Sequence, residues 1–149
     1  MALVSVIIPY YKKINQISKT LNSVLAQTFQ DFEIILIYDD DNVQDLVYIK
    51  ENFSKNSKIK IVQNKKNYGA GISRNIGIKH SSGSFIAFLD ADDIWYSDKL
   101  EKQVKFMSEN KYDFSFTNYF KKISNKKSIH VQSKKIKISY KDLLHDNEI

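Results

Sequence analysis

Short apolar runs alternate with helix-period segments along the first two-thirds of the chain, and this alternation constrains the fold more than any other feature. The apolar runs cover Leu3 to Pro9, Phe32 to Tyr38, Lys58 to Gln63 and Phe85 to Asp90. Strands that are separated by helices pair in parallel, because a parallel pair needs a long crossover connection. The pattern therefore predicts an α/β protein with a mostly parallel sheet.

Helical periodicity fills the intervals between these runs. The clearest segment recurs on one helical face at Ile14, Ile17, Leu21, Val24 and Leu25. Three further helices are predicted over Asp45 to Phe53, Ala70 to His80 and Ser97 to Glu109. Gly71 and Gly77 interrupt the second of these three, and each costs about 1 kcal/mol relative to alanine in a helix.

The pattern changes after residue 110. Phe114 to Ile123 and Ser128 to Ile138 are predicted to form two antiparallel strands, followed by a short helix over Tyr140 to Leu144. The chain is therefore expected to divide into a parallel-sheet part, residues 1–110, and a part with the hairpin and the short helix, residues 111–149.

Composition restricts the class of protein. The 149 residues amount to one domain with a substantial core, and no apolar run is long enough to span a membrane. The chain has no cysteine, so it has neither a disulfide framework nor a thiolate metal site. Its start shows no signal-peptide pattern. These observations predict a cytoplasmic location.

Positive charge is concentrated near the end of the chain. The formal charge is +6, and seven lysines with no acidic residue lie between Lys121 and Ser139. This lysine block is predicted to be a solvated hairpin face, or a surface that attracts anionic lipid headgroups. Nucleic acid is not expected as a partner, because no aromatic residue between Phe120 and Tyr140 supplies a stacking platform.

Polar clusters follow three of the predicted strands at their carboxyl ends. They are Pro9-Tyr10-Tyr11, Asp39-Asp40-Asp41 and Asp90-Ala91-Asp92-Asp93. In a sheet of this class such ends meet along one edge, in the crevice where ligands bind. Asp90 and Asp92 form a D-x-D pair, and such hard oxygen ligands suit Mg²⁺ or Mn²⁺ with a diphosphate. A solvated loop after the strand is the alternative.

Two further activities are compatible with strand-end carboxylates. A receiver-type signalling domain holds Mg²⁺ near a phosphorylated aspartate, but it needs an acidic pair after the first strand, where this chain has Pro9-Tyr10-Tyr11. An aspartate-nucleophile phosphatase has a signature similar to the segment from Asp90 to Ile94, but near the start of its fold. Both stay open as alternatives.

Five ordered motifs together give the chain a specific resemblance. They are Ser5 to Tyr11, the Gln27 to Glu33 link, Asn67-Tyr68-Gly69, Arg74-Asn75 and Leu89 to Asp93. This set resembles the family 2 inverting glycosyltransferases of the GT-A fold over roughly Val4 to Glu109. The resemblance implies a Rossmann-like three-layer sandwich with helices on both faces of the sheet. It also implies transfer of a sugar from a nucleotide-diphosphate sugar, often a UDP sugar.

The resemblance assigns roles to residues at the carboxyl edge. Those expected to bind the nucleotide sugar are Pro9, Tyr10, Tyr11, Asp39, Asn67, Gly71, Arg74, Asp90, Ala91 and Asp92. Asp92, with Asp90, is expected to hold the Mn²⁺ or Mg²⁺ that neutralises the leaving diphosphate. Asp39 matches a base-binding aspartate, while Tyr38 replaces a second aspartate common in the family. Trp95 is expected to brace this loop or to floor the sugar site.

The general base of an inverting transfer is not identified in the sequence. In the family it lies downstream of the D-x-D pair, in a region beyond Ile149, with His145, Asp146 and Glu148 as possible substitutes. The chain is thus expected to bind the donor without transferring the sugar. The resemblance further implies a glycan or lipid-linked acceptor and bacterial surface polysaccharide assembly at the inner face of the membrane.

Overall fold

The computed structural model describes residues 3–124 and 127–132 of the chain. Contacts divide the protein into two compact units, one up to Val104 and one from Lys105 onward. The division thus falls within the last long helix, a few residues before the boundary that the sequence predicts.

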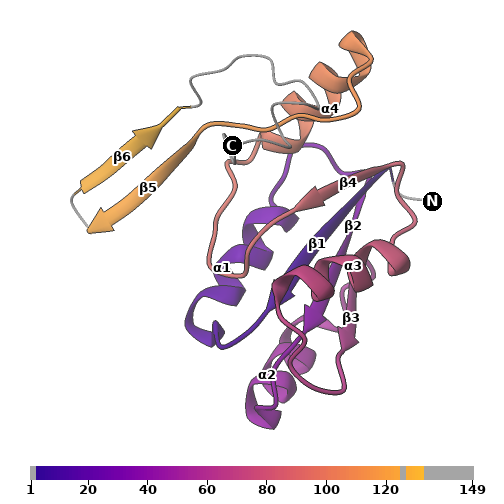
Figure 1. The fold of residues 1–149 in the computed structure, drawn as a ribbon, viewed down its shortest axis with the longest axis vertical. Coiled ribbons are helices and arrows are strands. Elements are labelled where there is room, and N and C mark those ends of the chain that lie inside the picture. The colour runs from indigo at the N-terminus through magenta and orange to yellow at the C-terminus, as the bar shows by residue number, and fades with distance from the viewer. Residues whose placement is uncertain (1–2, 125–126, 133–149) are drawn as a thin grey trace. The chain divides into compact units, whose positions relative to one another are not determined.

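A four-stranded parallel sheet is the centre of the first unit (Figure 1). Its strands are β1 (Val4–Tyr10), β2 (Phe32–Tyr38), β3 (Ile59–Gln63) and β4 (Phe85–Phe88). The strand order is β3-β2-β1-β4, and Val4 pairs with Phe32 on one side and with Phe85 on the other. The predicted parallel sheet is confirmed, with β1 in a central position.

Helices cover both faces of this sheet. They are α1 (Ile14–Leu25), α2 (Val43–Phe53), α3 (Ala70–His80) and the start of α4 (Lys99–Asn110), whose later residues belong to the second unit. Alternate residues of β1 and β2 pack with α1, α2 and the start of α4, whereas Ile7, Ile35 and Ile37 pack with Ile76 of α3. Figure 1 shows α3 on the other side of the sheet from α1. The predicted three-layer α/β sandwich is therefore confirmed.

Helix α3 packs unusually close to the sheet. Gly77 faces β1, and a Cβ atom at this position would overlap the side chain of Ile7. Gly71, in the same helix, has open space where its Cβ would lie. Gly77 is thus required by packing, while Gly71 leaves open space at the beginning of α3.

Helix α2 begins two residues before its predicted start. The side chain of Asn42 accepts hydrogen bonds from the backbone amides of Gln44 and Asp45, at 3.0 and 3.3 Å. Asparagine is a favoured N-cap because it satisfies amides that lack a helical partner. The cap fixes where the loop after β2 ends.

The second unit contains an antiparallel hairpin. Its strands are β5 (Tyr119–Ser124) and β6 (Lys127–Val131), and Tyr119 pairs with Val131. The predicted hairpin is confirmed, although β5 begins later than expected. The predicted helix over Tyr140 to Leu144 lies outside the described residues. Within the described part of the chain, no helix combines the length and apolar character that a membrane span requires.

Candidate functional site

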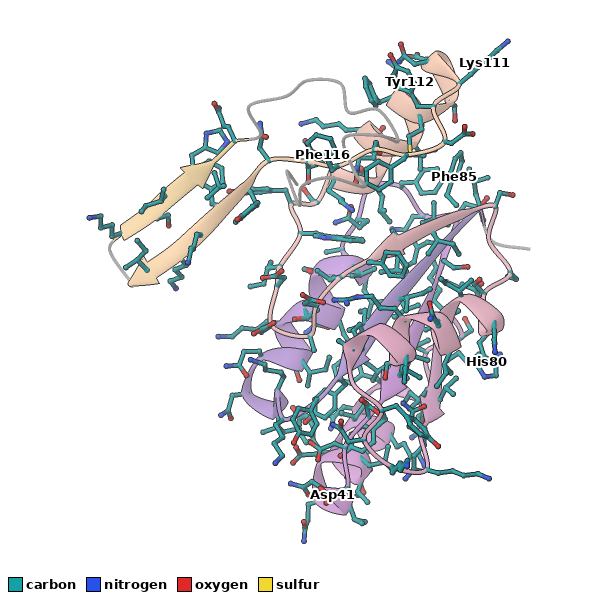
Figure 2. The ribbon with its side chains drawn as sticks, viewed as in Figure 1. Asp41, His80, Phe85, Lys111, Tyr112 and Phe116 are labelled. Atoms are coloured by element: carbon teal, nitrogen blue, oxygen red, sulfur yellow. The ribbon has the colours of Figure 1, made fainter. Side chains whose placement is uncertain are left out.

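The carboxyl ends of the parallel strands lie at one edge of the first unit. Figure 2 labels Asp41 at this edge, just after β2, and Phe85 at the amino-terminal end of β4. Because β1, β2 and β4 are parallel, the loops that follow them leave the sheet on the same side. All of the predicted site residues in these loops therefore belong to one edge.

Asp39 is buried and holds the loop that precedes α3. Its Oδ1 accepts hydrogen bonds from Asn64 Nδ2 at 2.7 Å and from the Tyr68 amide at 2.8 Å. Its Oδ2 accepts one from the Gly69 amide at 2.8 Å, and Asn67 Nδ2 donates to the Asp39 carbonyl at 3.0 Å. With 2% of its surface exposed, Asp39 is a loop anchor. The predicted contact of Asp39 with the nucleobase of the donor stays a prediction.

Gly69 makes this anchoring possible. Its φ of 82° lies in the left-handed region, which side chains with a Cβ rarely adopt. The turn at Gly69 aims two successive amides at the Asp39 carboxylate and starts α3 at Ala70. The predicted residues Asn67 and Asp39 are therefore brought together, with Gly71 exposed in the first turn of the helix.

Asp40 holds the loop that follows β1, a role that the sequence did not predict. Its Oδ2 accepts a hydrogen bond from the Lys12 amide at 2.9 Å, and its Oδ1 accepts one from the Asp41 amide at 2.8 Å. Lys12 has a φ of 52°, a left-handed conformation that is costly for a residue other than glycine. Asp40 thereby fixes the turn that presents Tyr11 and Lys13.

The two predicted tyrosines have different positions. Tyr10 is fully buried, stacks on Tyr38 with ring centroids 5.0 Å apart, and donates a hydrogen bond to Asp45 at 2.6 Å. Burial, reinforced by nearby carboxylates, raises the pKa of Tyr38 to about 12. Tyr10 is therefore part of the core, because β1 continues through it and turns its side chain inward, and its predicted contact with the nucleotide sugar stays a prediction. Tyr11 is 46% exposed and remains available.

The D-x-D carboxylates are exposed, and each is paired with a cation. Lys13 Nζ lies 2.7 Å from Asp92 Oδ2, and Arg74 Nη2 lies 2.6 Å from Asp90 Oδ1. Between them Ala91 is buried, and its carbonyl accepts a hydrogen bond from Thr20 at 2.9 Å. The buried Ala91 fixes the backbone of the turn, so that both carboxylates remain at the surface.

The carboxylates of this turn raise the pKa of two neighbouring groups, Lys13 and Asp93. The pKa of Lys13 is raised, first by the hydrogen bond to Asp92 and then by the charges of Asp92 and Asp90. The pKa of Asp93 is raised by burial and further by the negative charges of Asp92 and Asp90. The turn after β4 is thus a centre of negative charge.

Trp95 braces the loop between β4 and α4. Its backbone amide donates to Ser23 Oγ at 3.2 Å, and its side chain packs against the core. The Lys99 ammonium lies 3.5 Å from the centroid of its ring. Burial lowers the pKa of Lys99 to about 8. Trp95 therefore supports the D-x-D turn from the core side, which is one of the two roles that the sequence left open.

The remaining predicted residues are placed as follows. Pro9 is half-buried near the end of β1, and Arg74 joins α3 to the D-x-D turn. The candidate bases His145, Asp146 and Glu148 lie outside the described residues. Together, the contacts of Asp39, Asp40 and the two ion pairs connect the loops after β1, β2 and β4 with the beginning of α3.

The Asp90 and Asp92 carboxylates suit a divalent cation that phosphate groups of a substrate also coordinate. The described residues contain no group of three or more histidine, cysteine, aspartate or glutamate side chains positioned to hold a metal. Mg²⁺ and similar ions, however, are commonly held by one or two carboxylates with the phosphates of the substrate. Two exposed carboxylates at one turn match this donor set.

Solved structures share the fold of this chain. It is similar to residues 1–349 of TarS from S. aureus in complex with UDP-GlcNAc, with a TM-score of 0.64 and 31% identity, over 73% of this chain and 32% of that one. The mannosyltransferase PcManGT from Pyrobaculum calidifontis, at 20% identity and a TM-score of 0.64, covers 71% of this chain and 32% of its own. The class is therefore that of the GT-A glycosyltransferases.

The sequence identifies the family within this class. The profile of glycosyl transferase family 2 matches residues 5–148, and the chain belongs to this family. The Escherichia coli glucosyltransferase WfgD, named for UDP-Glc and alpha-D-GlcNAc-diphosphoundecaprenol, is 42% identical over 85% of this chain and 49% of its own length. TuaG of Bacillus subtilis, a putative teichuronic acid biosynthesis glycosyltransferase, is 40% identical over 78% of this chain and 46% of its own.

The matched stretch is only part of these relatives. The chain spans about half the length of WfgD and TuaG, and 21% of the length of an uncharacterized glycosyltransferase of Rickettsia conorii that is 45% identical over 87% of this chain. The family match gives no support to the receiver and phosphatase alternatives.

Proposed function

We propose that this chain is the donor-binding part of a metal-dependent glycosyltransferase that uses a UDP sugar. The observation that carries the proposal is the pair of exposed carboxylates Asp90 and Asp92 on one turn, at the edge of the sheet to which the exposed Tyr11 also belongs. TarS, similar in fold and 31% identical, is described with UDP-GlcNAc, and the name of WfgD includes UDP-Glc. These relatives support a uridine donor.

The chemistry of transfer explains why the carboxylates would lie at this edge. When the sugar leaves, negative charge develops on the nucleoside diphosphate, and a divalent cation stabilises it. In this proposal Asp92 and Asp90 hold the cation, the Tyr11 ring contacts the base, and Arg74 contributes positive charge beside the phosphates. Asp39 and Asp40 fix the loops that carry these groups.

Binding of UDP with Mn²⁺ tests this proposal directly. We expect the pair to raise the melting temperature of the wild-type protein and to bind measurably by calorimetry, while Asp92→Ala removes the effect. Asp98→Ala is a matched control, because Asp98 is similarly exposed and lies 2.5 Å from Lys102 in a local ion pair. Equal responses of the two variants would contradict the proposed metal role of Asp92.

The acceptor and the outcome of transfer are part of the same proposal. A lipid-linked or glycan acceptor is supported by the name of WfgD, and assembly of a bacterial surface polysaccharide by that of TuaG. We propose transfer with inversion, at the inner face of the membrane. Association of the purified protein with vesicles that contain anionic lipid, measured by sedimentation, tests the membrane step.

We also propose that these 149 residues bind the donor without transferring the sugar. The support is the length of WfgD and TuaG, which is about twice the stretch that this chain matches. With a UDP sugar and a diphosphoprenyl-linked sugar acceptor, an assay for UDP release should detect no turnover. Calorimetry should still detect binding of the UDP sugar. Robust turnover would show that a residue of this chain serves as the base.

A further inference from the structure

Lys13 occupies the position beside Asp92 that the proposed metal would need. Its ammonium lies 2.7 Å from Asp92 Oδ2, and both side chains are open to solvent, at 43% and 41% exposure. Lys13 is not one of the predicted site residues, and it comes from a different loop, the turn between β1 and α1. A divalent cation at Asp92 would meet an existing positive charge.

The backbone that carries Lys13 is fixed, whereas its side chain is free to change partner. The Lys12 amide is bound to the buried Asp40 carboxylate at 2.9 Å, so the turn holds its position. Lys13 itself ends in a flexible four-carbon stem with three rotatable donors. An exposed ion pair contributes at most about 1 kcal/mol, so its exchange for another anion costs little.

We propose that Lys13 switches partner during donor binding: it pairs with Asp92 in the ligand-free protein and moves to the diphosphate when the metal takes Asp92. This inference rests on the proposed function and extends it to a residue that sets the order of binding. A cation and the ammonium repel each other at one carboxylate, while the diphosphate of a bound nucleotide lies beside the metal and attracts the ammonium.

The switch makes the affinity for the metal depend on bound nucleotide, and the affinity for the nucleotide depend on bound metal. Without nucleotide, the metal must displace Lys13 from Asp92 and leave the ammonium without its carboxylate. With nucleotide, the diphosphate receives the ammonium, so the metal binds at a lower cost. By linkage, the metal improves nucleotide binding by the same factor. Part of this coupling comes from the direct metal–phosphate bond, and the remainder is assigned to Lys13.

Lys13→Met separates these two parts, because it keeps most of the apolar stem and removes the charge. For Mn²⁺ alone, measured by electron paramagnetic resonance, we expect binding about two- to fivefold tighter than in the wild type. For UDP, measured by calorimetry, we expect the loss of affinity to be about two- to fivefold larger with Mn²⁺ present than without it, because Lys13 pairs with the diphosphate only when the metal has taken Asp92. Lys13→Arg, which keeps the charge, should restore the wild-type pattern, and Lys19→Met, in the adjacent helix α1, should leave both affinities unchanged.

The outcomes distinguish this inference from the proposed function. If the wild type binds UDP with Mn²⁺ but Lys13→Met does not tighten Mn²⁺ alone, the partner switch is wrong. If Lys13→Met weakens UDP equally with and without metal, Lys13 is a fixed phosphate contact and the switch is again wrong. If the wild type binds neither UDP nor Mn²⁺, the proposed function fails, and the inference fails with it.

Discussion

The aspartates after β2 and those after β4 lie at the same edge of one sheet, but their surroundings differ. Asp39 and Asp40 are buried, and each carboxylate accepts several hydrogen bonds from the protein. Asp90 and Asp92 are exposed, and each is joined to one cation. A buried carboxylate whose acceptor positions are filled by donors of the protein contributes to folding. One that is held by an exposed ion pair can exchange its partner for a ligand.

Removal of the Asp39 carboxylate should have the largest effect on stability. Asp39→Ala leaves three donors from Asn64, Tyr68 and Gly69 without their acceptor. Because an unsatisfied buried donor costs about 1–3 kcal/mol, we expect a loss of about 3–5 kcal/mol in the free energy of unfolding. Urea denaturation measures it. Asp41→Ala, in the same acidic run but exposed, should change stability by less than about 0.5 kcal/mol.

If both variants destabilise the protein equally, the distinction between a buried anchor and an exposed acid is wrong. Asp39→Asn adds a further check, since its amide keeps one acceptor oxygen but turns an NH₂ group toward the amide donors. Its loss of stability should lie between those of the two alanine variants.

Two glycines of α3 show a similar contrast, because Gly77 packs against β1 whereas Gly71 has open space around it. Gly77→Ala forces a Cβ into Ile7 of β1 and should destabilise the protein by about 1–3 kcal/mol. Gly71→Ala meets open space and should stabilise it by up to about 1 kcal/mol, because alanine favours the helix. Thermal denaturation of both variants measures the difference, and equal effects would show that α3 is not packed as described.

Much of the fold follows from the sequence for identifiable reasons. Continuous apolar runs specified β1 and β2 almost to the residue, and the bounds of α3 were predicted as the structure has them. The burial of Tyr10 was not predicted, because β1 ends one residue later than expected and successive strand residues point to opposite faces. A cap such as Asn42 could have been recognised from its residue type.

The partners within the site could not be predicted in the same way. In a run such as Asp39-Asp40-Asp41, residue types do not reveal which carboxylate turns inward. That depends on where the amides of Lys12 and Gly69 lie, and both are distant in sequence. The pairing of Lys13 with Asp92 depends likewise on how the turns after β1 and β4 approach each other.

Lys99 shows how burial of a cationic side chain affects the pH dependence of stability. Burial lowers its pKa to about 8, so from about pH 8 upward the folded protein releases a proton that the unfolded chain keeps. Stability should therefore rise by about 1 kcal/mol from about pH 8 to about pH 9. Lys99→Met should remove this rise, as measured by urea midpoints at both pH values, and an equal rise in wild type and variant would assign it to other groups.

Removal of an exposed carboxylate after β4 should have the smallest effect on folding. Asp92→Ala breaks the ion pair with Lys13, but both side chains are open to water, where such pairs contribute about 0–1 kcal/mol. We expect a change below about 1 kcal/mol in the free energy of unfolding, further reduced at high salt because screening already weakens the pair. Urea denaturation at low and high ionic strength measures it. A loss as large as that of Asp39→Ala would mean that Asp92 supports the fold, and the separation between anchoring and ligand-ready carboxylates would then have no basis.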